Sequence, residues 1–161
     1  MIRRAEPSDL PRLNAIMFGS RAYTGIYRRI IEGYDLTATY LESHVVNLDD
    51  GNEGARGFYS LQLDGEAELD LLFCADEFQG QGVGAQLFAH MLETAKDAGT
   101  HRVRIVSHPL AVGFYERQGA IKVGVSPATG LISWSRPILV IDVPAEGQVY
   151  FPTPGSGESP V

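Results

Sequence analysis

The stretch FQGQGVGAQLF, residues 78–88, places Gly80, Gly82 and Gly84 at every second position. Glycine loses more conformational entropy than other residues when it becomes ordered, so three glycines within five positions need a structural reason. An apolar, alternating segment typical of a β-strand (66–75) precedes the stretch, and a segment with helical spacing follows it. The glycines therefore mark a junction between a strand and the N-terminus of a helix.

Length and composition describe a single globular domain. The chain has 161 residues, 44% hydrophobic and 20% charged, with a formal net charge of −7. This charge argues against nucleic acid as a partner. The lone Cys74 excludes an intramolecular disulfide and is typical of a reducing compartment, and we find no apolar run of membrane-helix length or signal-peptide core. We expect a cytoplasmic protein without membrane association.

The remaining pattern predicts a mixed α/β domain over residues 1–143, followed by a Pro-, Gly- and Ser-rich tail, 144–161, that is partly disordered or docks as an arm. Strands are expected at 1–5, 44–48, 55–63, 66–75, 101–107, 120–125 and 136–143. Helices are expected at 6–18, where Ser8 or Asp9 is the cap, at 22–31, at 35–44, from the glycines to Gly99, and at 109–119.

Backbone N–H groups at a helix N-terminus, with the positive end of the helix dipole, bind phosphate oxygens, and glycines let the backbone approach them. The chain has no Gly-Lys-Ser or Gly-Lys-Thr of a Walker loop, and its G-x-G-x-G spacing and mid-chain position differ from a dinucleotide fingerprint. A glycine-rich turn without a ligand is the structural alternative. The pattern Gln79-x-x-Gly82-x-Gly84 resembles the signature of the GCN5-related N-acetyltransferase (GNAT) family.

A second motif supports this resemblance. The segment HPLAVGFYERQGAIKVG, 108–124, is similar to the family pattern N-P-x-A-x-x-F-Y-x-x-x-G-F, with His108 at the Asn position and Ala120 at the Phe position. The resemblance covers residues 2–143. It implies a mixed, mostly antiparallel sheet of six to seven strands with about four helices. In that fold the fourth and fifth strands, here 66–75 and 101–107, splay apart to form a coenzyme slot.

The resemblance also implies where acetyl-CoA binds. The pyrophosphate would lie against the backbone of Gln79, Gly80, Gln81, Gly82, Val83, Gly84 and Ala85. Pantetheine would add to the sheet edge like a strand, through backbone groups of Leu72 and Phe73. His108 would hydrogen-bond pantetheine or the backbone beside it, or would carry a proton. Its alternative is a structural or solvent-facing role. No pair of histidines has metal-ligand spacing, so we expect no metal.

Two residues are the catalytic candidates that the resemblance implies. Tyr115 matches the family tyrosine whose hydroxyl faces the coenzyme sulfur, so it is the candidate acid, and packing beside Phe114 is its alternative. Glu68, eleven positions before Gln79, is the candidate base. Its alternative is the polar half of an alternating strand, and Asp70 on the same face is the reserve candidate.

The acceptor site is expected at the first two helices and the hairpins that face the slot. Tyr23, Tyr27 and Tyr34, with Arg21, have the chemistry to bind an aromatic or acidic acceptor, although surface tyrosines are also common on amphipathic helices. Gly25 predicts a break in the helix between the first two tyrosines.

Three functions remain open on these residues. The first is acetyl transfer from acetyl-CoA to the primary amine of a small molecule by direct attack in a ternary complex. The second is acetylation of a protein N-terminus, a lysine or an aminoacyl-tRNA, of which the acidic charge disfavours the last. The third is a non-catalytic coenzyme-binding module. A homodimer is expected from the resemblance alone.

Overall fold

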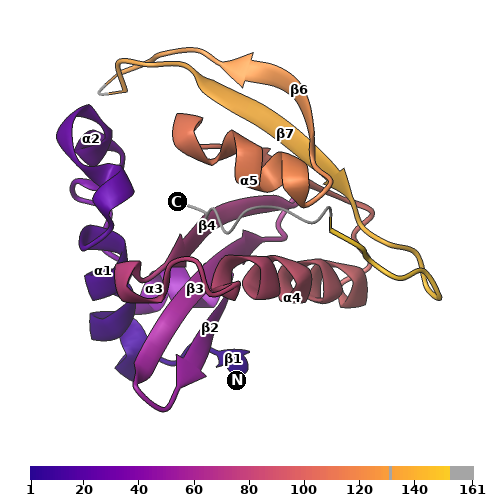
Figure 1. The fold of residues 1–161 in the computed structure, drawn as a ribbon, viewed down its shortest axis with the longest axis horizontal. Coiled ribbons are helices and arrows are strands. Elements are labelled where there is room, and N and C mark those ends of the chain that lie inside the picture. Colours follow the sequence, from indigo (N-terminus) through magenta and orange to yellow (C-terminus); the bar gives the residue numbers. More distant parts are fainter. Residues whose placement is uncertain (131, 153–161) are drawn as a thin grey trace.

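The computed structural model describes residues 1–130 and 132–152. The distal tail, for which we expected partial disorder, lies outside the described residues. A seven-stranded sheet has the order β1-β2-β3-β4-β5-β7-β6, in which β4 and β5 are parallel and all other neighbours are antiparallel (Figure 1). The mixed α/β sheet expected from the sequence is confirmed.

The strands are β1 (Ile2–Arg4), β2 (Val45–Gly51), β3 (Gly54–Gln62), β4 (Glu68–Cys74), β5 (Arg102–Val106), β6 (Ile121–Ser126) and β7 (Arg136–Asp142). The α-helices are α1 (Leu10–Phe18), α2 (Arg28–Ile31), α3 (Ala38–Ser43), α4 (Val83–Asp97) and α5 (Val112–Arg117). Short 3₁₀ turns precede several of them: η1 (Pro7–Asp9), η2 (Arg21–Tyr23), η3 (Gly25–Tyr27), η4 (Asp76–Phe78) and η5 (Pro109–Ala111).

Helices cover both faces of the sheet and produce two apolar clusters. One face carries α4 and α5, whose Leu87, Phe88 and Phe114 are buried against β3, β4, β5 and β7. The other face carries α1, η2 and α2, which pack on β2, β3 and β4 through residues such as Leu13 and Phe58. Strand β4 contributes side chains to both clusters. The two faces therefore form separate environments that meet at this strand.

The helix expected at 22–31 is wrong as a continuous element. The chain forms η2 and η3 before the single α-helical turn of α2. Gly25 has a φ of +60°, a left-handed conformation that side chains disfavour and that interrupts a helix. The break anticipated at Gly25 is confirmed. It turns a regular helix into a segment that presents aromatic side chains in several directions.

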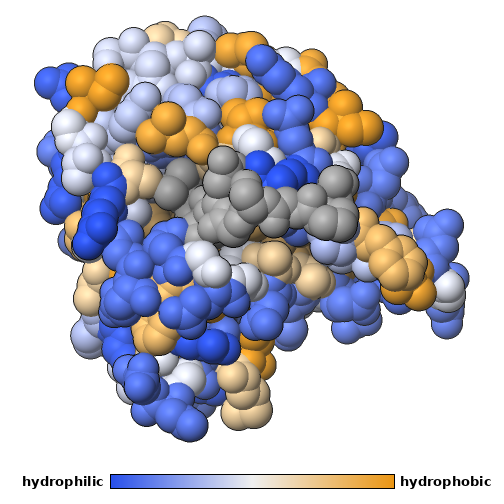
Figure 2. All heavy atoms as spheres, viewed as in Figure 1, coloured by the Kyte–Doolittle hydropathy of each residue, from blue (hydrophilic) through white to orange (hydrophobic). Residues whose placement is uncertain are grey.

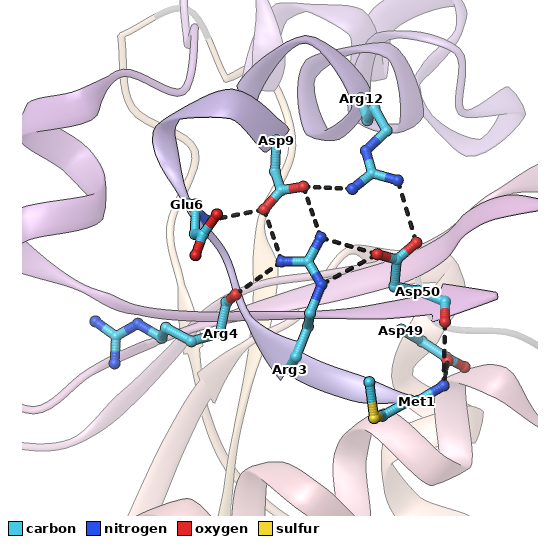
Figure 3. A network of polar contacts seen from close by, with 8 residues as sticks. All are labelled: Met1, Arg3, Arg4, Glu6, Asp9, Arg12, Asp49 and Asp50. Atoms are coloured by element: carbon cyan, nitrogen blue, oxygen red, sulfur yellow. Dashed lines mark hydrogen bonds and ion pairs between the residues drawn. The ribbon is translucent and has the colours of Figure 1, made fainter.

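The first helix also begins differently from the simple cap that we expected. Asp9 occupies the cap position of α1, but its carboxylate accepts hydrogen bonds from the Glu6 N–H at 2.8 Å and from the Arg3 guanidinium at 2.9 Å (Figure 3). Arg12 contacts the same carboxylate, and Asp50 of β2 pairs with both arginines. This network ties β1 and α1 to β2. The Arg3 hydrogen bond holds the pKa of Asp9 well below its usual range.

The parallel pair β4–β5 is short. Only Glu68 and Leu69 pair, with Arg104 and Ile105. On the other side of β4 the register shifts, because Ser60 lies opposite Leu71 while Leu61 lies opposite Leu69, which leaves Asp70 as an extra, bulged residue. Beyond the bulge β4 and β5 diverge. The splayed strands expected from the resemblance are thus present.

Figure 2 shows hydrophobic residues scattered among hydrophilic ones over the face that carries α4 and α5. Among the described residues, β6 exposes three apolar side chains, those of Ile121, Val123 and Val125. No helix in the described ranges is long and apolar enough to cross a membrane.

A glycine in β3 allows α4 to sit close to the sheet. A Cβ built on Gly57 lies 2.6 Å from the Phe73 carbonyl oxygen and 2.9 Å from Leu87 Cδ1, closer than such atoms approach. Hydrogen in place of a side chain therefore fixes the height of the α4 N-terminus above β3 and β4. The position of the glycine-rich loop depends on this contact.

We predict that Gly57→Ala lowers the free energy of unfolding by about 1–3 kcal/mol, because the added methyl group overpacks a backbone contact. Denaturant unfolding of the purified variant measures the change. Gly124→Ala in β6 is the matched control, since its added Cβ meets only Ile138 Cδ1 at 4.0 Å. Equal midpoints for Gly57→Ala and the wild type would show that α4 is free to shift.

Candidate active site

The glycine-rich loop forms a left-handed turn before α4. Gly80 has a φ of +78° and Gly82, the N-cap residue, a φ of +79°. The first backbone hydrogen bond of the helix runs from Gln86 N–H to Gly82 C=O. The N–H groups of the first turn, at Val83, Gly84 and Ala85, have no partner within the helix. Amide donors and the positive end of a 15-residue helix dipole therefore point toward the splayed strands.

The open edge of β4 begins after the bulge. Ala75 N–H donates to Arg56 C=O of β3, so residues 73 and 75 direct their backbone groups to β3 and residues 72 and 74 direct theirs to the diverging side. Leu72 thus offers backbone groups to the slot. Phe73 turns its backbone to β3 and packs its ring against Tyr23, with centroids 5.3 Å apart. The Gln79 amide donates to Cys74 C=O at 3.2 Å, which anchors the loop to this edge.

A cavity of about 200 Å³ lies where the splay meets the α1–α2 face. Its walls come from β4, β5, β7, α2 and the segments on either side of α2 and of β5. The lining residues are mostly apolar or aromatic, with a few polar groups: Tyr23, Ile30, Ile31, Tyr34, Asp70, Leu71, Phe73, Val106, His108, Ile132 and Arg136. Polar atoms supply more of its accessible lining than apolar atoms do, so the cavity offers charged and hydrogen-bonding contacts to a small molecule.

Asp70, at the bulge of β4, lines this cavity. Its carboxylate accepts a hydrogen bond from the Tyr34 hydroxyl at 2.9 Å and one from the Tyr40 hydroxyl. His44 Nε2 lies 3.8 Å from the same oxygen, and the Tyr40 ring stacks on the His44 ring. Burial and the charge of Asp70 raise the pKa of Tyr34 to about 12. Both phenols therefore stay protonated as donors and fix the carboxylate.

Glu68 lies at the closed end of the splay. Its carboxylate Oε2 is 3.5 Å from Arg104 Nη1 of β5, its partner in the parallel register. Burial raises the pKa of Glu68, Arg104 partly opposes this, and Asp70 adds to it. The two acidic side chains of β4 are close enough to influence each other, but of the two only Asp70 is part of the cavity lining.

Tyr115 lies on α5 beneath the slot, with 3% of its surface exposed. Its ring packs at 5.3 Å from Phe114 and 6.0 Å from Phe88, measured between centroids. Burial raises the pKa of its phenol, and Tyr23 adds to the rise. Tyr115 thus belongs to the buried α4–α5 cluster and is not among the described residues that line the cavity.

His108 has a structural task. Leu110 N–H donates to its Nδ1 at 3.0 Å, so Nε2 carries the proton and donates to Ala22 C=O at 3.0 Å. Burial lowers the pKa of this imidazole, which favours the neutral ring. Both nitrogens are therefore committed within the protein, and neither is left for the coenzyme contact that the resemblance implies. The ring joins η2 to η5 and forms part of the cavity wall.

The other predicted acceptor residues divide into two groups. Tyr23 and Tyr34 line the cavity, and Tyr27 packs behind its wall, 4.4 Å from the His108 ring and 4.8 Å from the Trp134 ring. Arg21 does not share this space. Its side chain is 90% exposed and its Nε lies 3.5 Å from Asp76, beside the loop that precedes α4.

Sequence reasoning missed Tyr40 and Arg136. Tyr40 gives no local signal beyond a helical position in α3, and it reaches Asp70 across thirty residues. Arg136 begins β7 and enters the cavity because β7 pairs with β5. Within the described ranges, no group of three or more His, Cys, Asp or Glu side chains is placed to hold a metal ion.

The end of the described chain also reaches this region. The Tyr150 hydroxyl donates to Gln118 C=O at 2.9 Å, at the end of α5, and its ring lies 6.3 Å from Phe88 of α4. Tyr150 therefore contacts both α4 and the end of α5, while Val149 and Phe151 are exposed.

Known protein families and structures agree on the fold. Residues 33–130 match the family model described as the acetyltransferase (GNAT) domain, which is more than half of the chain. The comparison with curated proteins gives no significant match.

Three solved structures illustrate the likeness. A GCN5-related N-acetyltransferase from Rhodopseudomonas palustris has a TM-score of 0.75 at 16% identity, over 88% of this chain and 94% of that one. The ribosomal-protein-S18-alanine N-acetyltransferase of Escherichia coli has a TM-score of 0.69 at 19% identity, over 94% and 99%. A GNAT family acetyltransferase from Elizabethkingia anophelis with acetyl-CoA bound has a TM-score of 0.63 at 20% identity, over 88% and 97%.

At these identities the likeness is one of fold, and the family match covers both the glycine-rich loop and the segment of Tyr115. The chain therefore belongs to the GCN5-related N-acetyltransferase family and is an N-acetyltransferase.

Proposed function

We propose that this protein transfers the acetyl group of acetyl-CoA to the primary amine of a small molecule, by direct attack in a ternary complex. One observation carries the proposal. The splay of β4 and β5 joins an amide-lined loop on the α4 side to a small cavity of about 200 Å³ on the α1–α2 side. A coenzyme and an acceptor can thus approach the same gap from opposite faces of the sheet.

The residues of the coenzyme side fit acetyl-CoA. Left-handed Gly80 and Gly82 and the amides of the first turn of α4 suit a pyrophosphate, and the free edge at Leu72 suits the amide groups of pantetheine. When bound, acetyl-CoA supplies a thioester whose carbonyl carbon gains a bond to the amine nitrogen as the bond from carbon to sulfur breaks. The chain itself must position the amine, remove one of its protons and protonate the departing sulfur.

Glu68 is the proposed base, directly or through water. The rise in its pKa that burial produces brings the carboxylate closer to the working range of a general base near neutral pH. Asp70 is held by two phenol hydrogen bonds at the cavity wall and is the reserve candidate. The proton that leaves the amine goes to this acidic pair.

Tyr115 is the proposed acid for the departing sulfur. Its phenol remains protonated because burial raises its pKa, and the residue lies on α5, in the cluster that packs α5 against α4 and the sheet. A protonated donor there would supply a proton as negative charge builds on sulfur.

Thiol release from acetyl-CoA with a panel of amines, amino acids, polyamines, aminoglycosides and N-terminal peptides tests the function. We expect thiol release and a mass increase of one acetyl group with a small amine. Turnover of peptides alone would assign the protein to macromolecular acetylation. Absence of acetyl-CoA binding would overturn the proposal.

We predict that Gly82→Asp weakens acetyl-CoA binding by about tenfold or more, because it places a carboxylate beside the phosphates. The rise in melting temperature on addition of acetyl-CoA measures the loss. Gly99→Asp is the matched control, since it has the same left-handed backbone, φ +78° against +79°, and open space at the added Cβ. Equal coenzyme-induced shifts for both variants would place the pyrophosphate elsewhere.

For Glu68→Gln we expect a rate loss that is largest at low pH and shrinks as pH rises. In the wild type the base works once pH exceeds the raised pKa of Glu68, whereas the variant depends on amine that is already unprotonated. The pH–rate profile of kcat/KM shows the difference. A profile identical to that of the wild type would leave Glu68 as an ion-pair partner of Arg104 only.

Tyr115→Phe is expected to lower kcat with little change in coenzyme affinity. The ring and its packing remain, while the donor that acts only on the developing thiolate is removed. General acid catalysis contributes about 10²–10⁴-fold, and thiolate is a good leaving group, so we expect the low end or less. Single-turnover rates with saturating substrates check this. A wild-type rate, with chemistry limiting, would assign the proton to water.

A further inference from the structure

Arg136 lies at a place where the fold leaves a positive charge without a partner. It is the first residue of β7, next to the end of β5, and its side chain lines the cavity. Its Nε is buried and has no hydrogen-bond partner. Among the residues that the structure describes, none forms an ion pair or a hydrogen bond with this guanidinium.

A half-buried guanidinium without an ion pair, whose Nε is buried without a hydrogen-bond partner, is unusual. Buried charges are nearly always paired, and a buried donor without a partner costs free energy. Arg104 pairs with Glu68, Arg102 pairs with Asp142, and Arg56, whose Nε is also buried without a hydrogen bond, pairs with Asp49 through Nη2. Arg136 lines the cavity without such an ion pair, which favours a ligand as its partner.

The opposite charge lines the same cavity. Asp70 is held on β4 by Tyr34 and Tyr40, and Arg136 stands on β7, across the gap where β4 and β5 diverge. The two side chains do not form an ion pair with each other, and Arg136 acts on Glu68 only at a distance, where its charge lowers the pKa of that carboxyl. The space between them suits a molecule that carries one charge of each sign.

Resting on the proposed function, we propose that the acceptor is a small amino acid, whose carboxylate binds Arg136 while its amino group faces Asp70 and the diverging end of β4. A guanidinium binds a carboxylate through parallel hydrogen bonds, which also orients the ligand. The amine then lies beside Asp70, the reserve candidate for the base, next to the slot in which the thioester is expected.

The charges and the volume of the cavity narrow the class of acceptor further. One arginine opposite one aspartate matches a zwitterion with a single negative charge, and a doubly charged phosphate would leave a net negative charge beside Asp70. The volume of about 200 Å³ is below the ~300–1,000 Å³ of pockets for drug-sized ligands. Apolar and aromatic walls from Ile30, Leu71 and Phe73 suit an apolar side chain.

Matched acceptors test the carboxylate. Leucine, leucinamide and 3-methylbutylamine share one carbon skeleton, as do phenylalanine, phenylalaninamide and phenethylamine, and 4-aminobutyrate and butylamine. We expect the wild type to prefer an acid over its neutral analogues by about tenfold to a hundredfold in kcat/KM, the size of a charged hydrogen bond. Equal rates for acids and neutral analogues overturn the inference.

Arg136→Gln tests the residue. We expect KM for the acids to rise by the same factor while KM for the neutral amines stays unchanged, and Arg136→Lys to restore part of the preference. Arg102→Gln, in the exposed pair with Asp142, is the matched control and should keep the wild-type preference. If Arg136→Gln changes KM for acids and for neutral amines by the same factor, Arg136 does not bind the carboxylate.

A binding measurement separates this inference from the proposed function. Calorimetric titration of the same acids and amines into the acetyl-CoA-free protein needs no turnover. Tighter binding of an acid to the wild type than to Arg136→Gln supports the site even without catalysis, and no difference refutes it. If only the neutral amines release thiol, the proposed acetyl transfer stands, but the acceptor is not an amino acid.

Discussion

The short pairing of β4 with β5 is the constraint on which the other features of the site depend. Two residue pairs join the strands, and the bulge at Asp70 then turns β4 away from its neighbour. A longer parallel ladder would satisfy the backbone of Leu72 and close the gap. The unpaired edge is the feature that a strand-like ligand requires. The sheet therefore leaves backbone groups of Leu72 unpaired at the edge where we propose that pantetheine binds.

In the proposed function, one face of the sheet binds the coenzyme and the other binds the acceptor. On the α4 side, recognition relies on backbone groups, because amides and left-handed glycines bind phosphates whatever the acceptor is. Gly57 keeps this helix seated against β3. On the α1–α2 side, Asp70, Arg136 and several aromatic rings line one small cavity, so the acceptor that we propose would be recognised by side chains. A family with one coenzyme and many acceptors needs this separation.

Buried polar groups hold the acceptor side in place. His108 is kept neutral and bonds both η2 and η5, so it couples the broken helical segment to the loop after β5. Tyr40 bridges Asp70 and Ser60, with its hydroxyl 2.6 Å from the serine oxygen. Rigid polar networks of this kind orient a carboxylate more firmly than the exposed strand position alone would do.

The sequence by itself determined the elements and the coenzyme half. Alternating and helical apolar patterns, the left-handed glycines and the order of the two motifs are local signals, so the strands, α4 and the loop could be predicted from neighbouring residues. The broken segment 21–31 shows the limit, because one glycine outweighed a helical pattern. Of the acceptor half, the sequence indicated Tyr23, Tyr34 and Asp70, and tertiary structure decided the rest. Tyr40 reaches Asp70 across thirty residues, and Arg136 arrives through the antiparallel pairing of β7 with β5. Such contacts depend on strand register and long-range packing, which no local pattern encodes.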